Sequence, residues 1–286
     1  MPLPIHLALV SEAKSLGLSE LTTVAAAIQK QIARDLSQHW DVQGTLSAFA
    51  RLEDVPPGYW PVIVKDDIEV DAAGTHCDPN GQPIALVTSG PGWSVTASHE
   101  SIEMLVDPFG NRTVAGPSPK PDQGRVELLV EVADPVGDST YTINGVRVCD
   151  YCTPRYYDPV QSPGVQYCYT GSITGPRQLL QNGYLTWHDP VGSEWWQQSR
   201  FGDGDPAIVS LGPLLKAACG MRTAVDPLAA RRRREQAPAA APPARPVVSP
   251  EVVASSRAKA EMWRAHIRKL QAARKRRRSG PSSSGS

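Results

Sequence analysis

The segment Ser98–Pro108, with the sequence Ser-His-Glu-Ser-Ile-Glu-Met-Leu-Val-Asp-Pro, is the most informative part of this chain. Its apolar residues occupy positions i, i+3 and i+4, the spacing that places side chains on one face of a helix. Pro108 cannot continue a helix, so we expect a helix over Ser94–Asp107. The apolar face of this helix comprises Ile102, Leu105 and Val106.

The polar side chains of the same helix form a ridge. Residues four apart lie one above the other, so His99, Glu103 and Asp107 share a face. The carboxylates of Glu103 and Asp107, four residues apart, repel each other. Asp107 also lies in the last turn, where the helix dipole disfavours an anion. A bound divalent cation would reverse both penalties. Glu100 would lie beside that cation, as the general base does in a His-Glu-x-x-His helix. The alternative is a solvated polar face without a metal.

A later segment supplies further carboxylates. Arg125–Asp134 is rich in β-forming residues, and we expect a strand with Glu127 and Glu131 on one face and Asp134 at its end. A helix that donates His and Glu, with a third carboxylate from a later element, is the pattern of a catalytic zinc site with an open position. A half-exposed strand with an acidic outer face explains Glu127 equally well.

Together, Ser98-His99-Glu100-x-x-Glu103-x-x-x-Asp107-Pro108 and Glu131-x-x-Asp134 resemble a group of uncharacterised bacterial proteins with a zincin-like core. A related pattern occurs in exordium-like plant proteins. The similarity extends over roughly residues 1–215. It includes the stretches Asn144-Gly145-Val146, Thr153-Pro154 and Gly183-Tyr184-Leu185.

The resemblance implies a role for each matching residue. His99, Glu103 and Glu131 would be the metal ligands, and Glu100 the general base for a metal-bound water. Asp134 would orient a ligand. Glu103 stands where standard zincins have a second His, which makes the site harder and more anionic and lowers the Lewis acidity of the metal. Zn²⁺ is the expected metal, with Ca²⁺ or Mn²⁺ as alternatives, and peptidase activity follows less directly than metal binding.

The remaining histidines and cysteines give weaker signals. His188, beside Asp189, could donate a hydrogen bond to a tetrahedral intermediate, although an aromatic loop that packs on itself explains it too. His76 lies in a predicted turn and could approach the site from outside, but such a residue is more often a surface His. The five cysteines are odd in number and irregularly spaced, which disfavours a disulfide framework and fits a reducing compartment.

The flanking segments indicate an α+β domain. Glu20–Trp40 has the periodicity of an amphipathic helix, with Ser19 as its N-cap. We expect a zincin-like core in which the metal-site helix packs on a small, mostly antiparallel sheet. An irregular, loop-rich lobe would follow from Thr153 to Pro213. The expected β segments are Ile5–Val10, Pro61–Val64, Ile84–Val87 and Tyr141–Val148, the last with an Asn-Gly turn.

The composition changes after Asp226. From Arg231 onward the chain holds 15 of its 29 basic residues but three of its 29 acidic residues, so an acidic body precedes a basic tail. We expect a metal-binding domain over residues 1–226, a disordered Ala/Pro/Arg linker over 227–255, and a basic, conditionally helical tail over 256–286. Residues 231–278 could bind nucleic acid or another acidic partner without sequence preference, or could be a solubilising extension.

The sequence therefore favours a metal-dependent hydrolase, a zincin-like peptidase that acts on a peptide or protein. The alternative is a non-catalytic binding or structural protein that a metal stabilises, with a basic tail that tethers an acidic partner. No run of about 18 apolar residues predicts a transmembrane segment. The N-terminus lacks the pattern of a signal peptide, so a cytoplasmic location is the default expectation.

Overall fold

The computed structural model describes residues 4–69, 72–77, 81–202 and 204–213, together with 225, 228–229, 231–232 and 234–235. The chain divides into two compact units, Met1–Pro238 and Ala239–Ser286, and every described residue belongs to the first unit. The predicted tail over 256–286 and the linker residues after position 235 lie outside the described residues. The described part is mixed α and β, as the sequence predicts. None of its helices is long and apolar enough to cross a membrane.

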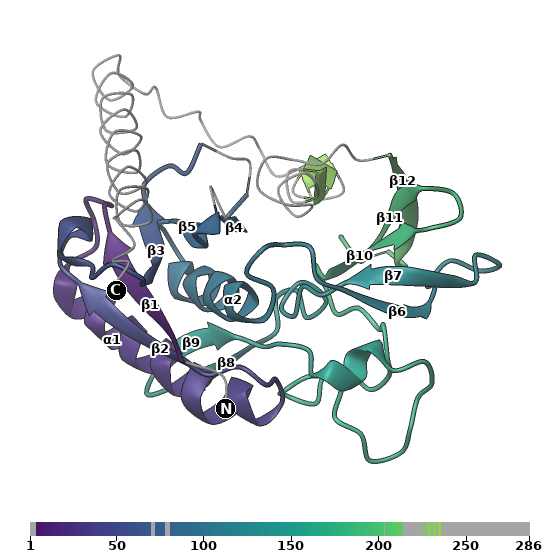
Figure 1. The fold of residues 1–286 in the computed structure, drawn as a ribbon, viewed down its shortest axis with the longest axis horizontal. Helices are drawn as coiled ribbons and strands as arrows, with labels where there is room; N and C mark the ends of the chain where they lie inside the picture. Colours follow the sequence, from purple (N-terminus) through teal and green to yellow (C-terminus); the bar gives the residue numbers. More distant parts are fainter. Residues whose placement is uncertain are drawn as a thin grey trace, which may run out of the picture. The chain divides into compact units, whose positions relative to one another are not determined.

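The first sheet is mostly parallel, and the expectation of a mostly antiparallel sheet next to the metal-site helix is wrong (Figure 1). Its strand order is β2-β1-β3-β5-β4, and only β4 runs antiparallel to its neighbour, β5. Parallel strands need a crossover connection, and the helix between the first two strands provides one. The strands are β1 (Ile5–Ser11), β2 (Gly44–Phe49), β3 (Trp60–Lys65), β4 (Gly74–Cys77) and β5 (Ile84–Thr88).

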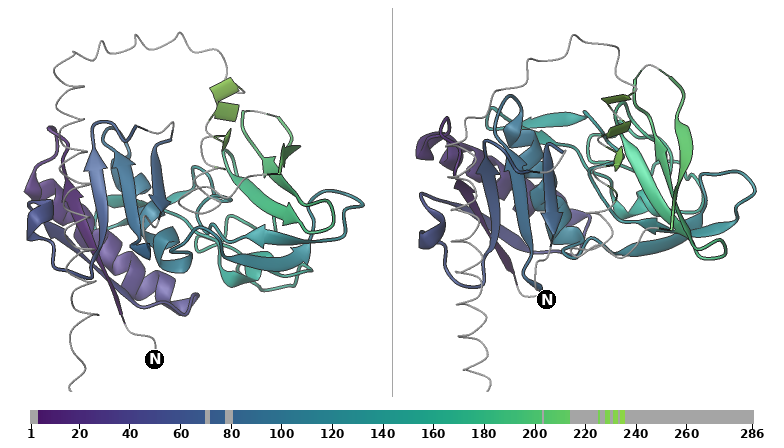
Figure 2. Two further views of the ribbon diagram at one scale, coloured as in Figure 1. Left: turned by 45° about the horizontal axis from the view of Figure 1, so that its top comes forward. Right: turned by 90° about the horizontal axis from the view of Figure 1, so that it is seen from above.

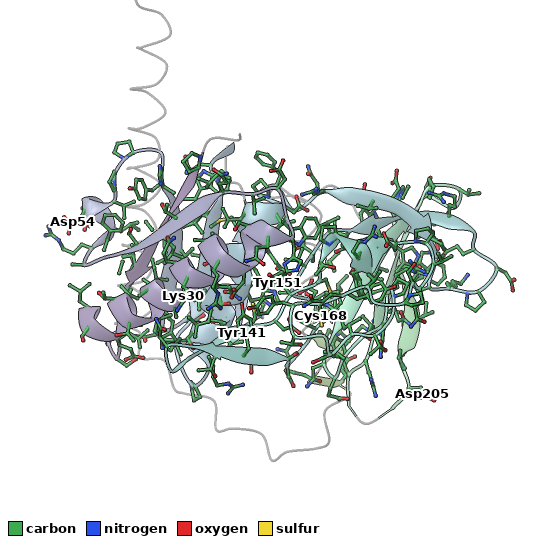
Figure 3. All side chains as sticks on the ribbon, turned by 90° about the horizontal axis from the view of Figure 1, so that it is seen from below. Lys30, Asp54, Tyr141, Tyr151, Cys168 and Asp205 are labelled. Atoms are coloured by element: carbon green, nitrogen blue, oxygen red, sulfur yellow. The ribbon has the colours of Figure 1, made fainter. Side chains whose placement is uncertain are left out.

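Helix α1 (Leu18–Lys30) connects β1 to β2 and ends at Lys30, labelled in Figure 3. The chain then continues through a π-helical turn η1 (Gln31–Asp35) and a 3-10 turn η2 (Leu36–Gln38). The helix begins two residues before the predicted start. Ser19 therefore lies inside the first turn and is not the N-cap. Apolar residues at steps of three and four face the core, namely Leu21, Val24, Ala25, Ile28, Ile32 and Leu36.

Helix α2 (Trp93–Val106) confirms the predicted metal-site helix to within a residue at each end. Gly92 precedes it with φ 83°, a left-handed conformation that glycine adopts without strain. The apolar face predicted from the sequence is buried. This helix contacts β3, β4 and β5 on one side and the hairpin strand β9 on another, so it lies between the first sheet and that hairpin (Figures 1 and 2).

The hairpin β8 (Thr140–Ile143) and β9 (Val146–Cys149) confirms the predicted Asn-Gly turn. Asn144 and Gly145 both have positive φ, 51° and 81°, as a two-residue hairpin turn of this type requires.

A second, fully antiparallel sheet has the order β12-β11-β10-β7-β6. The irregular lobe predicted over Thr153–Pro213 is therefore wrong in its second half, which forms three of these strands. β7 ends at Leu129 and does not reach Asp134, and residues 130–134 are all buried and do not alternate between two faces. The strands are β6 (Thr113–Pro117), β7 (Arg125–Leu129), β10 (Tyr184–Asp189), β11 (Glu194–Ser199) and β12 (Ala207–Gly212). Two further 3-10 turns among the described residues are η3 (Leu52–Asp54) and η5 (Pro154–Tyr157).

The described residues between 225 and 235 are helical, whereas the sequence predicts a disordered linker from residue 227. Val225 and Ala229 lie four positions apart and are both buried. The Arg232 guanidinium donates a hydrogen bond of 3.0 Å to Gln197 Oε1 of β11. These arginines thus belong to the folded unit. The sequence analysis gave weight to their charge and overlooked the short apolar repeat of Val225 and Ala229.

Candidate metal centre

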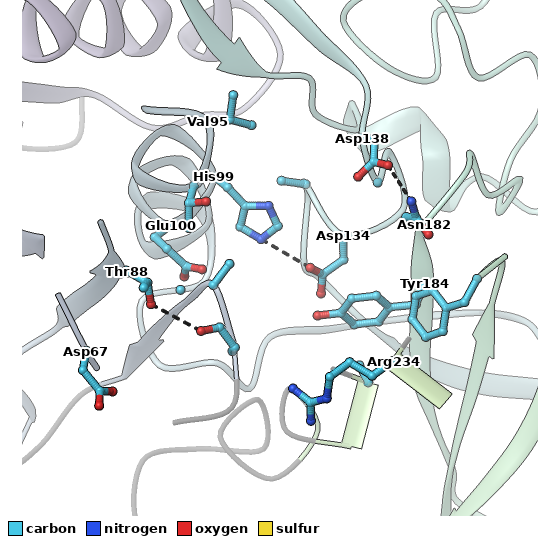
Figure 4. A pocket seen from close by; sticks show the side chains of 18 of the residues that line it. Asp67, Thr88, Val95, His99, Glu100, Asp134, Asp138, Asn182, Tyr184 and Arg234 are labelled. Carbon is cyan, nitrogen blue, oxygen red and sulfur yellow. Dashed lines mark hydrogen bonds and ion pairs between the residues drawn. The ribbon is translucent and has the colours of Figure 1, made fainter. Parts of the chain in front are cut away.

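A cavity of about 540 Å³ has helix α2 as one wall (Figure 4). His99 and Glu100 enter it from α2, and Asp134 enters it from the loop that follows β7. Tyr184 of β10 and Arg234 line the opposite side, and the figure shows both directed toward the centre. The cavity has the size of an ordinary small-molecule or substrate site.

Three of the predicted site residues converge at this wall. His99 Nε2 lies 3.0 Å from Glu103 Oε2 and 3.3 Å from Asp134 Oδ1. One donor atom from each residue lies within 4.8 Å of the others, close enough to hold one metal ion. The Glu103 and Asp134 side chains are 0% and 4% exposed, whereas the His99 side chain is 23% exposed. His99 is therefore the most exposed residue of the cluster on the side of the cavity.

A backbone hydrogen bond ties the two halves of this cluster together. The helical period places Glu103 one turn after His99. The N–H of Ala133 donates to Glu103 Oε1 at 2.9 Å, while Oε2 of the same carboxylate faces His99. Glu103 thereby fixes the segment that carries Asp134 against α2.

The electrostatics of the cluster favour a cation. Burial of the imidazole opposes a charge on His99, but the negative charge of Glu103 and hydrogen bonds to Asp134 and Glu103 outweigh it. Together with the charge of Glu100, they raise the pKa of His99 well above its usual value. Without a metal ion, the carboxylates hold a proton on this histidine. A metal ion that binds there has to displace that proton.

Glu100 is held by a histidine that the sequence analysis placed at the surface. His76 lies in β4, is 0% exposed, and directs Nδ1 to Glu100 Oε2 at 3.4 Å. Its Nε2 lies 2.9 Å from the carbonyl oxygen of Asp107, which can only accept, so Nε2 donates this hydrogen bond. The favoured interpretation as a surface turn residue is wrong. The Asn80-Gly81 pair before β5 is a hairpin signal that could have predicted a strand at His76.

His76, Glu100 and Glu103 also bring their donor atoms within 4.8 Å of one another. This second cluster of described residues is buried and shares Glu103 with the first. Gly74 of β4 provides the room for Glu100, because a Cβ at this glycine would lie 2.6 Å from Glu100 Oε1. Strand β4 therefore determines where the Glu100 carboxylate lies.

The other predicted residues occupy different positions. Glu131 is buried and lines a small adjoining cavity with Asp134 and Tyr184, and neither of the two clusters of described residues includes it. Asp107 is buried at the end of α2, where its carboxylate accepts a hydrogen bond of 2.8 Å from the N–H of Arg112.

His188 lies on the second sheet and is not among the described residues that line the large cavity. Its Nδ1 lies 2.8 Å from Glu127 Oε2, and its ring packs against Trp195 with 5.2 Å between the centroids. The residue of β10 that reaches the cavity is Tyr184, which the sequence analysis left without a role. Arg234 was also missed, because it stands in a run of arginines.

The donor set of the first cluster suits a borderline metal ion. An imidazole nitrogen and two carboxylates are ligands that Zn²⁺ and Mn²⁺ accept, whereas Ca²⁺ binds through oxygen ligands. The chemistry of His99, Glu103 and Asp134 therefore fits zinc better than calcium.

Comparison of the chain with protein-family models, with curated proteins and with solved structures found no match. The resemblance to the zincin-like group stays a prediction, and the geometry of the residues is the basis for any functional assignment.

Proposed function

We propose that this protein is a metal-dependent hydrolase with a zincin-like core, in which His99, Glu103 and Asp134 hold Zn²⁺ and Glu100 is the general base. The observation that carries the proposal is the convergence of one imidazole nitrogen and two carboxylate oxygens at the wall of a large cavity. The packing of α2 against β3, β4 and β5 supports the zincin-like core.

The ligand set differs from the one that the resemblance implies. Asp134 Oδ1 is 3.3 Å from His99 Nε2, whereas Glu131 lines the small adjoining cavity together with Asp134. We therefore assign Asp134 as the third ligand and Glu131 as the residue that supports the Asp134 loop. The two residues exchange the roles expected from the sequence pattern.

The exposure of the cluster favours catalysis over a purely structural role. Structural zinc sites are closed by four protein ligands, and catalytic sites keep a position open. The His99 side chain is 23% exposed and lines a cavity of about 540 Å³, so a small molecule can approach the cluster. A metal ion whose only task was to stiffen the fold would not need this access.

Bound Zn²⁺ would supply Lewis acidity, which polarises a carbonyl group and makes water easier to deprotonate. The protein groups supply the rest. Glu100, beside His99 at the cavity wall, accepts a proton from the attacking water and passes it to the leaving nitrogen of a peptide. His76 holds the Glu100 carboxylate in position. Tyr184 and Arg234, directed into the cavity, are placed to donate hydrogen bonds to the negative charge that develops on the carbonyl oxygen.

Two measurements on the full chain test this assignment. Protein purified without chelators is expected to contain about one zinc ion per chain by elemental analysis, and His99→Ala is expected to lose it. Glu100→Gln is expected to keep the zinc and to lose at least about 100-fold in kcat on a mixed fluorogenic peptide library, because general-base catalysis contributes this much. Zinc retention with unchanged peptide hydrolysis in Glu100→Gln would refute the role of Glu100. Equal metal content in His99→Ala and the unaltered protein would refute the metal centre.

A further inference from the structure

Two buried cysteines stand opposite each other in the irregular segment after β9. Cys152 and Cys168 form an isolated antiparallel β-bridge. The N–H of Thr153 donates to the carbonyl oxygen of Tyr167, and the N–H of Tyr169 donates to that of Tyr151, both at 2.9 Å. Tyr151 and Cys168, one from each side of the bridge, are labelled in Figure 3.

This pattern of hydrogen bonds defines the kind of pair. The two bonds flank the cysteines and none joins them, so Cys152 and Cys168 form a non-hydrogen-bonded pair. The Cα atoms of such a pair are about 4.5 Å apart, and the side chains lie on the same side of the ladder. Disulfides span Cα separations of about 4.4–6.8 Å. The pairing thus gives the two cysteines a Cα separation that a disulfide can span without a change of register; in this structure Cys168 Sγ accepts a hydrogen bond from the N–H of Ile173, so the bond requires a rotation of that side chain at most.

We propose that Cys152 and Cys168 form an intrachain disulfide when the folding chain meets a low-molecular-mass disulfide oxidant. One cysteine thiolate attacks a sulfur of the oxidant, which releases one small thiol and leaves a mixed disulfide on the protein. The second cysteine thiolate attacks the protein sulfur of that mixed disulfide, and the second small thiol leaves. In total, the two cysteines lose two electrons and two protons, which the oxidant takes up as two thiols.

The burial of the pair determines when the bond forms. Both cysteines are 0% exposed, and they are not bonded to each other in this structure. Burial raises the pKa of the Cys168 thiol and raises that of Cys152 well above its usual range. Few thiolates exist in the folded protein, and an oxidant cannot reach them. Oxidation is therefore expected before the segment closes, and the finished bond is then protected from reductants.

The bond would brace the segment that carries a proposed metal ligand. The N–H of Cys152 donates to the carbonyl oxygen of Val132 at 2.6 Å, and Asp134 follows two residues later. A covalent link to Cys168 closes residues 153–167 into a loop and so restricts the unfolded chain. It adds stability to this side of the fold whether or not a metal is bound, so the inference does not rest on the proposed function.

Refolding of the full chain with glutathione disulfide and glutathione, or with glutathione alone, tests the proposal. The oxidised sample is expected to weigh about 2 Da less, and its non-reduced peptide map is expected to contain a peptide that joins Cys152 to Cys168. Its Tm is expected to exceed that of the reduced sample by about 5 °C or more, a difference that dithiothreitol abolishes. Native protein treated with the same oxidant is expected to react much more slowly.

Cys77→Ser is the matched control, since it removes a thiol outside the bridge and is expected to keep the Tm difference. Cys152→Ser and Cys168→Ser are expected to lose it. Because the peptide map uses the unaltered chain, it remains decisive if either serine variant fails to fold. Glutathione adducts without a crosslink, or a crosslink between other cysteines, would overturn the proposal.

Discussion

Helix α2 and the segment over residues 130–134 supply the two halves of the candidate site, and they differ in how their side chains are positioned. On α2 the helical period alone stacks His99 and Glu103 on one ridge. In the other segment the strand has already ended, and Asp134 is held in place by tertiary hydrogen bonds, among them those from the N–H of Ala133 to Glu103 and from the N–H of Tyr184 to the carbonyl oxygen of Asp134. The first half is a local property of the sequence, and the second half is a tertiary one.

Glu103 joins the two halves, so its replacement is expected to have the largest effect. Glu103→Ala removes a fully buried carboxylate from the Ala133 N–H and from His99, at a cost of about 3 kcal/mol in the free energy of unfolding. Urea unfolding checks this value. Glu103→Gln keeps an acceptor for the N–H and is expected to unfold closer to the unaltered protein, yet to weaken zinc binding by at least about 100-fold. Full zinc affinity in Glu103→Gln would show that the two halves do not meet at a metal.

A matched pair of variants decides which residue of the tertiary half is the ligand. Asp134→Asn is expected to weaken zinc binding by more than about 100-fold, because it removes a carboxylate that lies 3.3 Å from His99 Nε2. Glu131→Gln is expected to weaken it by about 10-fold, at the lower end of the range for residues that support a ligand. Competition with a chromophoric chelator measures both. The opposite order would restore the ligand set that the sequence pattern implies.

The position of the Glu100 side chain on α2 also depends on a tertiary contact, the one with strand β4. In Gly74→Ala the new methyl group would meet Glu100 Oε1 and a Thr96 methyl carbon, each at 2.6 Å. The Glu100 carboxylate has to move, and kcat is expected to fall by about 10- to 100-fold with zinc retained. Gly17→Ala is the control, because nothing lies within 4 Å of its Cβ position. Equal losses of kcat in Gly74→Ala and Gly17→Ala would show that the position of the Glu100 carboxylate does not determine kcat.

The sequence predicted what short-range periodicity determines. It placed α2 to within a residue at each end and identified the turn at Asn144-Gly145, whose positive φ angles are a local requirement. It could not give the relative direction of strands β1, β2, β3 and β5, because a short apolar run does not determine whether the neighbouring strand runs parallel or antiparallel to it. For the same reason it misjudged His76, whose burial depends on α2, a helix that begins 17 residues later in the chain.

The site was predicted in part for the same physical reason. An alternating pattern was extended through Glu131, but β7 ends at Leu129 and the following residues are buried on all sides. Once a segment leaves a strand, the period of two no longer tells which side chains share a face. His99 and Glu103 were assigned from the sequence alone, whereas the choice between Asp134 and Glu131 needed coordinates.

The smallest expected effect concerns the proton on His99, because its release on zinc binding depends on both halves of the site. Three carboxylates face this histidine, Glu100 and Glu103 from α2 and Asp134 from the loop after β7, and they raise its pKa. Metal-free His99 is therefore protonated at neutral pH, and zinc has to expel that proton, so zinc affinity is expected to rise with pH through neutrality, by at most about 10-fold per unit. Calorimetry in two buffers with different ionisation enthalpies measures the protons released.

Asp134→Asn removes one of the partners that raise the pKa of His99, so the number of protons released near neutral pH is expected to fall. Glu131→Gln is the matched control, since Glu131 belongs to neither cluster of described residues. Unchanged proton release in Asp134→Asn would mean that Glu103 and Glu100 hold the proton alone. The helix would then set the charge of the site by itself, and the loop after β7 would contribute position only.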